Sequence, residues 1–173
     1  MRQPERSPYN RMSELRKIVS GGQTGVDQAA LRAARDWGFE IGGWCPPGRE
    51  AEAGLIPAEL PLKETPNDRS AKAPNVPHSQ RTEWNVRDSD GTLVVQSAGK
   101  EDPGTQWTIE CAKHYERPVL ICDIDDLEAK EKIERWLAAN QISTLNIAGP
   151  SEGTSPGVGD KTYALLRRAF AEL

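Results

Sequence analysis

The chain has no long apolar run, few cysteines and no excess of basic charge. A bilayer-spanning helix needs about 20 consecutive apolar residues, so we expect no membrane partner. The 22 basic residues are outnumbered by 26 acidic ones, which gives a net charge of −4 and no electrostatic basis for binding nucleic acid. The three cysteines form no CxxC pair, which favours a reducing compartment, and we therefore expect a cytoplasmic protein.

Residues that could carry catalysis or a metal are also scarce. Only two histidines are present, so there are few candidates for a general base. Cys111 and His114 are three residues apart, but a structural zinc ion normally needs four closely spaced ligands, and we expect no metal site. Glu110, Glu83 and Asp27 are the acid–base candidates, and none has a partner at a diagnostic spacing. These features favour binding over catalysis.

The 173 residues are enough for one domain with a sizeable core. Residues 1–16 are polar and contain four arginines, and they lack the apolar stretch of a secretory signal. We expect a flexible N-terminal arm over 1–16. A single domain is expected over 17–173.

Segments typical of strands and of helices alternate along the domain. Strands are expected over 18–20, 39–44, 91–96, 118–122 and 145–148, and helices over 24–37, 79–88, 105–115, 127–140 and 160–173. This alternation predicts an α/β, Rossmann-like, doubly wound fold whose mainly parallel sheet has helices on both faces. Residues 45–77 contain seven prolines and break the pattern. So long a loop is often functional, although it can also be a passive excursion over the surface.

Three strand-to-helix turns, over 20–25, 97–105 and 149–159, are polar and contain glycine. In a parallel sheet with right-handed crossovers, such turns gather at one edge. Free N–H groups and the positive end of the helix dipole attract phosphate or another oxyanion there. Glycine leaves the backbone open to a ligand because it has no Cβ. The sequence therefore predicts one composite pocket for an anion.

The first of these turns differs from better-known phosphate-binding loops. Its glycines have the spacing GGxxG, whereas a dinucleotide site has GxGxxG and a P-loop ends in Lys-Ser or Lys-Thr. Asp27 stands just inside the following helix, where an acid suits the dipole. It can simply cap the first turn, or it can accept a hydrogen bond from a ligand.

The helix expected over 79–88 adds two further candidates. Arg81 and Asn85 are four residues apart and share one helix face, although an ordinary solvated face is the competing interpretation. Arginine can hold an oxyanion through two hydrogen bonds, and asparagine can fix its orientation. The complete set of candidate ligand-binding residues is Gly21, Gly22, Gln23, Thr24, Gly25, Asp27, Arg81, Asn85, Ser97, Gly104, Thr105, Thr108, Gly149, Pro150 and Ser155.

Four ordered blocks of sequence resemble the molybdenum carrier protein family. They are Ser20-Gly-Gly-Gln-Thr-Gly-Val-Asp-Gln-Ala, Gly43-Trp-Cys-Pro-Pro-Gly-Arg-Glu-Ala-Glu-Ala-Gly, Arg81-Thr-Glu-Trp-Asn-Val-Arg-Asp-Ser-Asp-Gly-Thr, and Asn146-Ile-Ala-Gly-Pro with Ser155-Pro-Gly. That family is similar to a circularly permuted branch of the Rossmann-like, lysine decarboxylase-like (LOG) superfamily. The resemblance implies a pocket for an anionic, pterin- or nucleotide-like ligand. It also implies a homo-oligomer, either a dimer or a tetramer, and molybdenum cofactor as a possible cargo.

One departure bears on catalysis. Phosphoribohydrolases of this superfamily carry PGGxGTxxE, with a catalytic glutamate, whereas the nearest segment here is Asp102-Pro-Gly-Thr-Gln-Trp-Thr-Ile-Glu. One glycine is missing and Glu110 comes one step late, which turns a helical side chain by about 100°. We therefore favour a binding or carrier protein for an anionic small molecule, such as molybdenum cofactor or a molybdate-like oxyanion. The alternative is a nucleotide-binding protein or a nucleotide N-glycosidic hydrolase.

Overall fold

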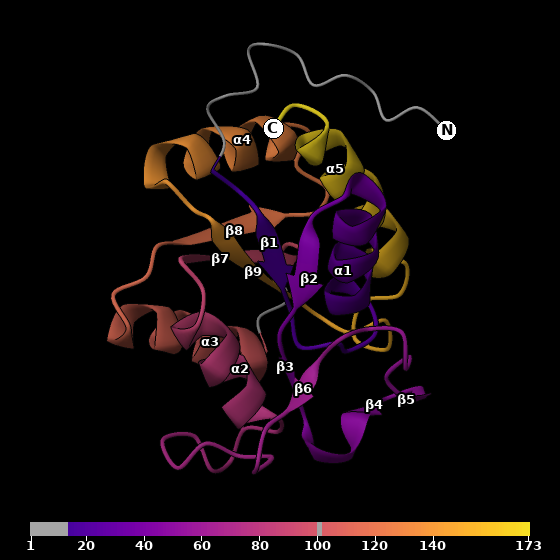
Figure 1. Ribbon diagram of the computed structural model, residues 1–173, viewed down its shortest axis with the longest axis vertical. Coiled ribbons are helices and arrows are strands. Elements are labelled where there is room, and N and C mark those ends of the chain that lie inside the picture. Colours follow the sequence, from indigo (N-terminus) through magenta and orange to yellow (C-terminus); the bar gives the residue numbers. More distant parts are fainter. Residues whose placement is uncertain (1–13, 100–101) are drawn as a thin grey trace.

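The computed structural model describes residues 14–99 and 102–173, so most of the arm expected over 1–16 lies outside the described residues. Its centre is a five-stranded parallel sheet with the order β2-β1-β9-β7-β8 (Figure 1). The strands are β1 (Lys17–Val19), β2 (Glu40–Gly42), β7 (Gly91–Gln96), β8 (Val119–Asp123) and β9 (Thr144–Ala148). The expected α/β class with a parallel sheet is confirmed.

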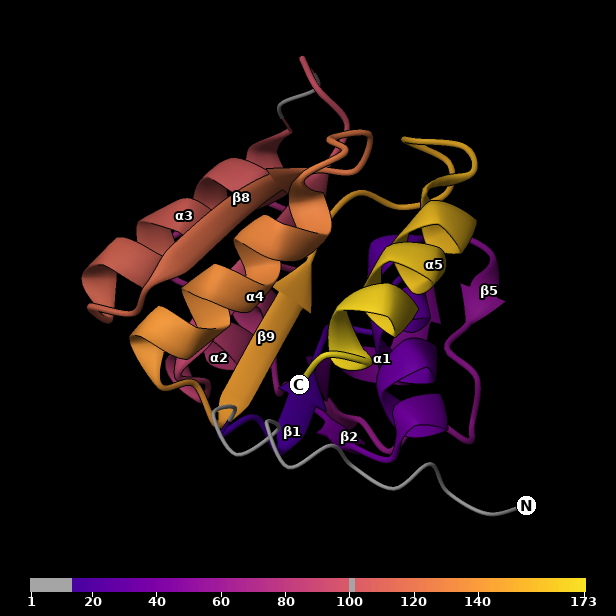
Figure 2. The ribbon, with the colours of Figure 1, turned by 90° about the horizontal axis from the view of Figure 1, so that it is seen from above.

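Five helices cover the two faces of this sheet (Figures 1 and 2). They are α1 (Val26–Trp37), α2 (Ser79–Arg87), α3 (Pro103–His114), α4 (Ala129–Asn140) and α5 (Val158–Phe170). Helices α1, α4 and α5 share one buried apolar cluster with strands β1, β7 and β9, whereas α2 and α3 pack around a second cluster. Within the described residues, no helix has the length and apolar character needed to cross a membrane.

Helix α1 shows why the sequence folds as it does. Ala29, Ala30, Ala33 and Ala34 are fully buried, and such small side chains let α1 and α5 approach closely. The helix ends at Gly38, whose φ of 89° is left-handed and whose N–H bonds back to the last turn. Glycine suits this position because it adopts the left-handed conformation at little steric cost.

Some local expectations were wrong. The strand expected over 39–44 is broken at Gly43, which has a φ of 128°, so β2 lies in the main sheet and β3 (Trp44–Cys45) pairs with β6 (Lys63–Glu64). The helix expected over 105–115 begins two residues earlier, at Pro103 after the capping residue Asp102, and the helix expected over 127–140 begins at Ala129.

The proline-rich segment has a compact structure of its own. It contains a short 3₁₀ turn (Pro47–Arg49) and a hairpin of β4 (Glu50–Ala51) and β5 (Gly54–Leu55). The Arg49 guanidinium donates to the carbonyl oxygens of Leu62, Pro57 and Leu60 at 2.9–3.2 Å. Ile56, Leu60 and Leu62 are buried with Leu31 of α1. These contacts hold the segment against the body of the protein.

Candidate functional site

A cavity of about 810 Å³ opens at the carboxyl end of the sheet. It is lined by the ends of β7 and β9, the beginnings of α2 and α3, the β4–β5 hairpin and the turn after β9. In this strand order the chain goes from β1 outward to β2 and returns on the other side at β7, and such a switch point is where α/β sheets bind ligands. The cavity brings together seven predicted residues: Gln23, Arg81, Gly104, Thr105, Thr108, Gly149 and Pro150.

The glycines of the first turn face protein and not the cavity. A Cβ on Gly21 would collide with the guanidinium of Arg81. A Cβ on Gly22 would lie 2.5 Å from Leu62 Cδ1, and one on Gly25 would lie 2.5 Å from the carbonyl oxygen of Pro150. These glycines are thus needed so that other parts of the chain can pack against the turn, a reason that the sequence did not reveal.

Asp27 is buried behind the cavity, with 1% of its surface exposed. Its Oδ2 accepts hydrogen bonds from the Gln23 backbone N–H at 3.3 Å and from Arg81 Nη1 at 3.2 Å. Burial raises the pKa of Asp27 above its usual value, and the neighbouring Arg81 cation opposes that rise. Asp27 does not line the cavity, and its hydrogen bond from Arg81 connects it to a residue that does.

The chain's own carboxylates use many of the donors that the three turns offer. Asp102 accepts from Thr105 N at 2.8 Å at the start of α3. Glu152 accepts from Gly157 N at 2.9 Å and from Gly159 N at 2.7 Å at the start of α5. Glu52 accepts from Gly153 N at 2.7 Å. An external anion would therefore have to compete with internal ones at these helix ends.

Several predicted residues hold segments together outside the cavity lining. Asn85 accepts from Trp44 N at 2.8 Å and donates to Trp44 O at 2.9 Å, which ties α2 to β3. Thr24 donates to Glu52 Oε1 at 2.5 Å, linking the first turn to the hairpin. The Ser97 and Ser155 hydroxyls are 3.5 Å apart and join the second turn to the third.

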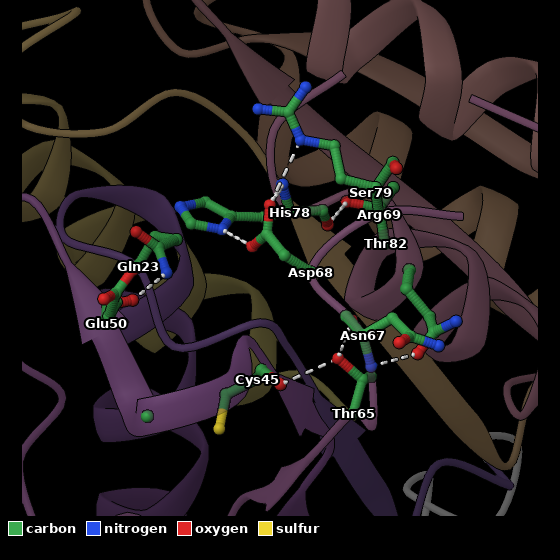
Figure 3. A network of polar contacts seen from close by, with 12 residues as sticks. Gln23, Cys45, Glu50, Thr65, Asn67, Asp68, Arg69, His78, Ser79 and Thr82 are labelled. Atoms are coloured by element: carbon green, nitrogen blue, oxygen red, sulfur yellow. Dashed lines mark hydrogen bonds and ion pairs between the residues drawn. The ribbon is translucent and has the colours of Figure 1, made fainter. Parts of the chain in front are cut away.

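Two residues that the sequence did not single out form a polar pair at the cavity. His78 lines the cavity, and its Nδ1 lies 2.6 Å from Asp68 Oδ1 (Figure 3). The His78 backbone N–H donates to Asp68 Oδ2 at 3.3 Å. Burial opposes ionisation of Asp68, but the hydrogen bonds from His78 outweigh it and lower the pKa of that carboxyl. His78 and Asp68 are ten positions apart and belong to no known motif, so no sequence signal could have found the pair.

The charges of the lining are mixed. Arg81 supplies a positive charge, and three carboxylates, those of Glu50, Glu52 and Asp102, also line the cavity. Hydrogen bonds from Thr24 and from the Gly153 N–H lower the pKa of Glu52. The apolar part of the wall includes Leu55, Val76, Pro77 and Val94. The cavity thus offers a cation for an acidic group, acceptors for hydroxyl or amino groups, and apolar surface for a flat body.

Among residues 14–99 and 102–173, no three metal-ligating side chains of the His, Cys, Asp or Glu type come together. The thiols of Cys45, Cys111 and Cys122 are free and buried. Burial raises the pKa of Cys111 to about 12 and that of Cys122 to about 11. These two thiols are therefore protonated and unreactive at neutral pH.

A parallel sheet with helices on both faces and a cavity at its carboxyl end defines a Rossmann-like α/β protein. The chain belongs to the circularly permutated YpsA SLOG family, whose model matches residues 18–170. It is similar to a protein from Syntrophus aciditrophicus SB, solved at 1.45 Å and named "Putative molybdenum carrier protein". The two are 39% identical over 89% of this chain and 94% of the other, with a TM-score of 0.80. No curated protein matches the chain.

Proposed function

We propose that the protein binds a small anionic molecule in this cavity and serves as its carrier, with molybdenum cofactor or a molybdate-like oxyanion as the candidate cargo. The observation that carries the proposal is the position of Arg81. It lines the cavity, and its buried Nε has no hydrogen-bond partner in the described part of the chain. A guanidinium binds oxyanions through paired, charge-assisted hydrogen bonds.

Arg81 is held in place before any ligand arrives. Asp27 accepts from its Nη1, and Gly21 leaves room for the guanidinium to lie against the backbone. Only 18% of the Arg81 side chain is exposed, which limits its rotamers. A side chain that is already ordered loses less conformational entropy on binding, so the arrangement favours affinity.

The size and walls of the cavity also support this proposal. About 810 Å³ falls within the range of small-molecule sites, roughly 300–1,000 Å³. The apolar wall at Val76, Pro77 and Val94 suits a flat ring system such as a pterin. The relative from Syntrophus aciditrophicus carries the name of a molybdenum carrier, which points to the same class of cargo.

A nucleotide is the second candidate ligand. Glu50, Glu52 and Asp102 line the cavity and could accept hydrogen bonds from ribose hydroxyls. The hydrolase suggested from the sequence has less support, because Glu110 is exposed on α3 and does not line the cavity, and Asp27 is buried behind Arg81. We therefore place the nucleotide second, as a bound molecule.

Titration calorimetry with molybdate, tungstate, phosphate, molybdenum cofactor and nucleoside monophosphates would test the proposal. Arg81→Ala alone would leave Asp27 buried without its partner, so the test variant is the neutral pair Asp27→Asn/Arg81→Gln. Arg87→Ala, on the same helix but outside the cavity lining, is the matched control. We expect saturable binding in wild type and in Arg87→Ala and at least tenfold weaker binding in the neutral pair. Equal affinity in all three proteins would contradict the proposal.

We further propose that the protein works in the cytoplasm as a homo-oligomer, a dimer or a tetramer. Three free thiols suit a reducing compartment. Strand β8 is an edge strand of the sheet. Ile121 on this strand is 45% exposed and Leu127, shortly after the strand, is 94% exposed, which suits burial against a second copy of the chain. Light scattering would test this, and a monomer at micromolar concentration would contradict it.

A further inference from the structure

The His78–Asp68 pair has the geometry of a general base and the carboxylate that orients it. Asp68 Oδ1 lies 2.6 Å from Nδ1 of the His78 imidazole. In Figure 3 the other ring nitrogen points away from Asp68, to the side where Gln23 and Glu50 are drawn, and both of these residues also line the cavity. With Nδ1–H donated to a carboxylate, Nε2 is the acceptor, which is the tautomer that a general base needs.

The backbone around His78 indicates that this orientation is fixed. His78 has a φ of 56°, a left-handed conformation that is uncommon for a residue with a side chain. The Asp68 carboxylate accepts from the His78 backbone N–H and also contacts Nδ1 of the His78 ring. Asp68 therefore holds both the backbone and the side chain of His78. Strained residues of this kind persist where the surrounding contacts over-determine them, often at functional sites.

We propose that the cavity hydrolyses a phosphodiester, with His78 as the general base, Asp68 as its positioning residue and Arg81 as the group that holds the phosphate. The proposal rests on the anion-binding role of Arg81 given above and extends it from binding to turnover. Arg81 follows His78 by three residues at the beginning of α2, and both line the same cavity.

The lining also suits a diester. A diester carries one negative charge, which Arg81 can match as the cationic side chain of this lining that contacts Asp27. The apolar residues Val76, Pro77 and Val94 can pack against the organic groups that a diester carries on both sides.

The reaction needs only water as co-reactant. His78 Nε2 removes a proton from a water molecule, and the water oxygen forms a bond to phosphorus. The bond from phosphorus to the leaving alcohol oxygen then breaks. The leaving oxygen lies on the opposite side of phosphorus and takes a proton from solvent water, while the imidazolium, stabilised by Asp68, releases its proton to solvent, which leaves a phosphate monoester and an alcohol.

The test measures release of p-nitrophenol from bis(p-nitrophenyl) phosphate by the full chain. His78→Asn is the main variant, because asparagine tolerates a positive φ and keeps the fold. We expect it to lower kcat by about a hundredfold or more, the usual contribution of a general base. Free imidazole should restore part of the rate to His78→Gly, a rescue that a merely structural role would not give.

Two further variants sharpen the result. Asp68→Asn should lower kcat with little change in KM and shift the acidic limb of the pH–rate profile, because its role is to position His78. His114→Asn is the matched control: it removes the other histidine, which is exposed and bonded to Lys72, and should leave the rate unchanged.

Binding and turnover fail separately in this design. Calorimetry with the same diester on His78→Asn reports binding without hydrolysis. If the diester binds and wild type releases no p-nitrophenol between pH 5 and 9, or if His78→Asn is as fast as wild type, the hydrolase is ruled out and the anion-binding proposal stands. If neither the diester nor any of the anions binds, the anion-binding proposal fails as well.

Discussion

The glycine turn over 20–25, followed by Asp27, and the proline-rich segment over 45–77, followed by His78, differ in how they relate to the cavity. The turn carries the strongest motif in the sequence, yet its glycines face protein and its acid is buried. The proline-rich segment has no glycine-bearing strand-to-helix turn, yet its residues Glu50, Glu52 and Leu55 and the adjoining His78 line the cavity. The glycines of the motif thus serve the packing of the turn, while the second region supplies side chains to the cavity lining.

The largest difference between the two regions should appear in stability, at the Asp27–Arg81 pair. Arg81→Ala leaves a carboxylate that is 2% exposed without its partner, and breaking a buried pair costs about 3–5 kcal/mol. Urea unfolding followed by circular dichroism would measure this loss. The neutral pair Asp27→Asn/Arg81→Gln should recover most of it, and a loss below about 1 kcal/mol in Arg81→Ala would show that the turn does not depend on the pair.

A comparison of two glycines isolates steric support of the turn. Gly22 and Gly99 have nearly the same left-handed φ, 78° and 73°, but a Cβ would meet Leu62 at the first and open space at the second. Gly99→Ala should cost about 1–2 kcal/mol for the backbone conformation alone. Gly22→Ala should cost a further 1–3 kcal/mol or so, because Leu62 and Ile56 must move. Equal losses in thermal unfolding would show that packing against the turn is unimportant.

The sequence predicts the sheet and the helices better than it predicts the contacts around the cavity. Alternating segments with β-branched strands and alanine-rich helix faces are local signals, so the parallel sheet and most element positions could be predicted. Seven predicted residues, Arg81 among them, line the cavity, but the contacts that hold them there were missed because they join distant parts of the chain. Arg81 meets Asp27 across 54 residues, and Glu52 meets Gly153 across 101. Tertiary packing decides which donor a carboxylate meets, and a single sequence gives no local signal for such a pairing.

The two regions should also respond to acid in opposite ways. The pKa of Asp68 is lowered in the folded state, so its stabilising contribution is present above its unfolded value near 3.8 and is lost as the pH falls below it. The pKa of Asp27 is raised, so ionising it weakens the folded state as the pH rises above 3.8. Asp68→Asn should therefore flatten the acid limb of a stability–pH curve, and Asp27→Asn should steepen it. Urea midpoints between pH 3 and 7 would show the two slopes, and equal slopes would remove the contrast.

The smallest effect on stability, with a clear effect on binding, is expected at the tip of the hairpin. Leu55 lines the cavity but is 76% exposed, so Leu55→Ser should change stability by no more than about 0.5 kcal/mol. It should nevertheless weaken any ligand that packs against this wall, since the apolar contact is made only in the complex. Leu127→Ser, at a leucine that is 94% exposed and outside the cavity lining, is the control and should leave affinity unchanged when it is compared in the same oligomeric state. If Leu55→Ser binds as tightly as wild type, the ligand contacts the α2 and α3 side of the cavity alone, and the proline-rich segment contributes charges but no apolar contact.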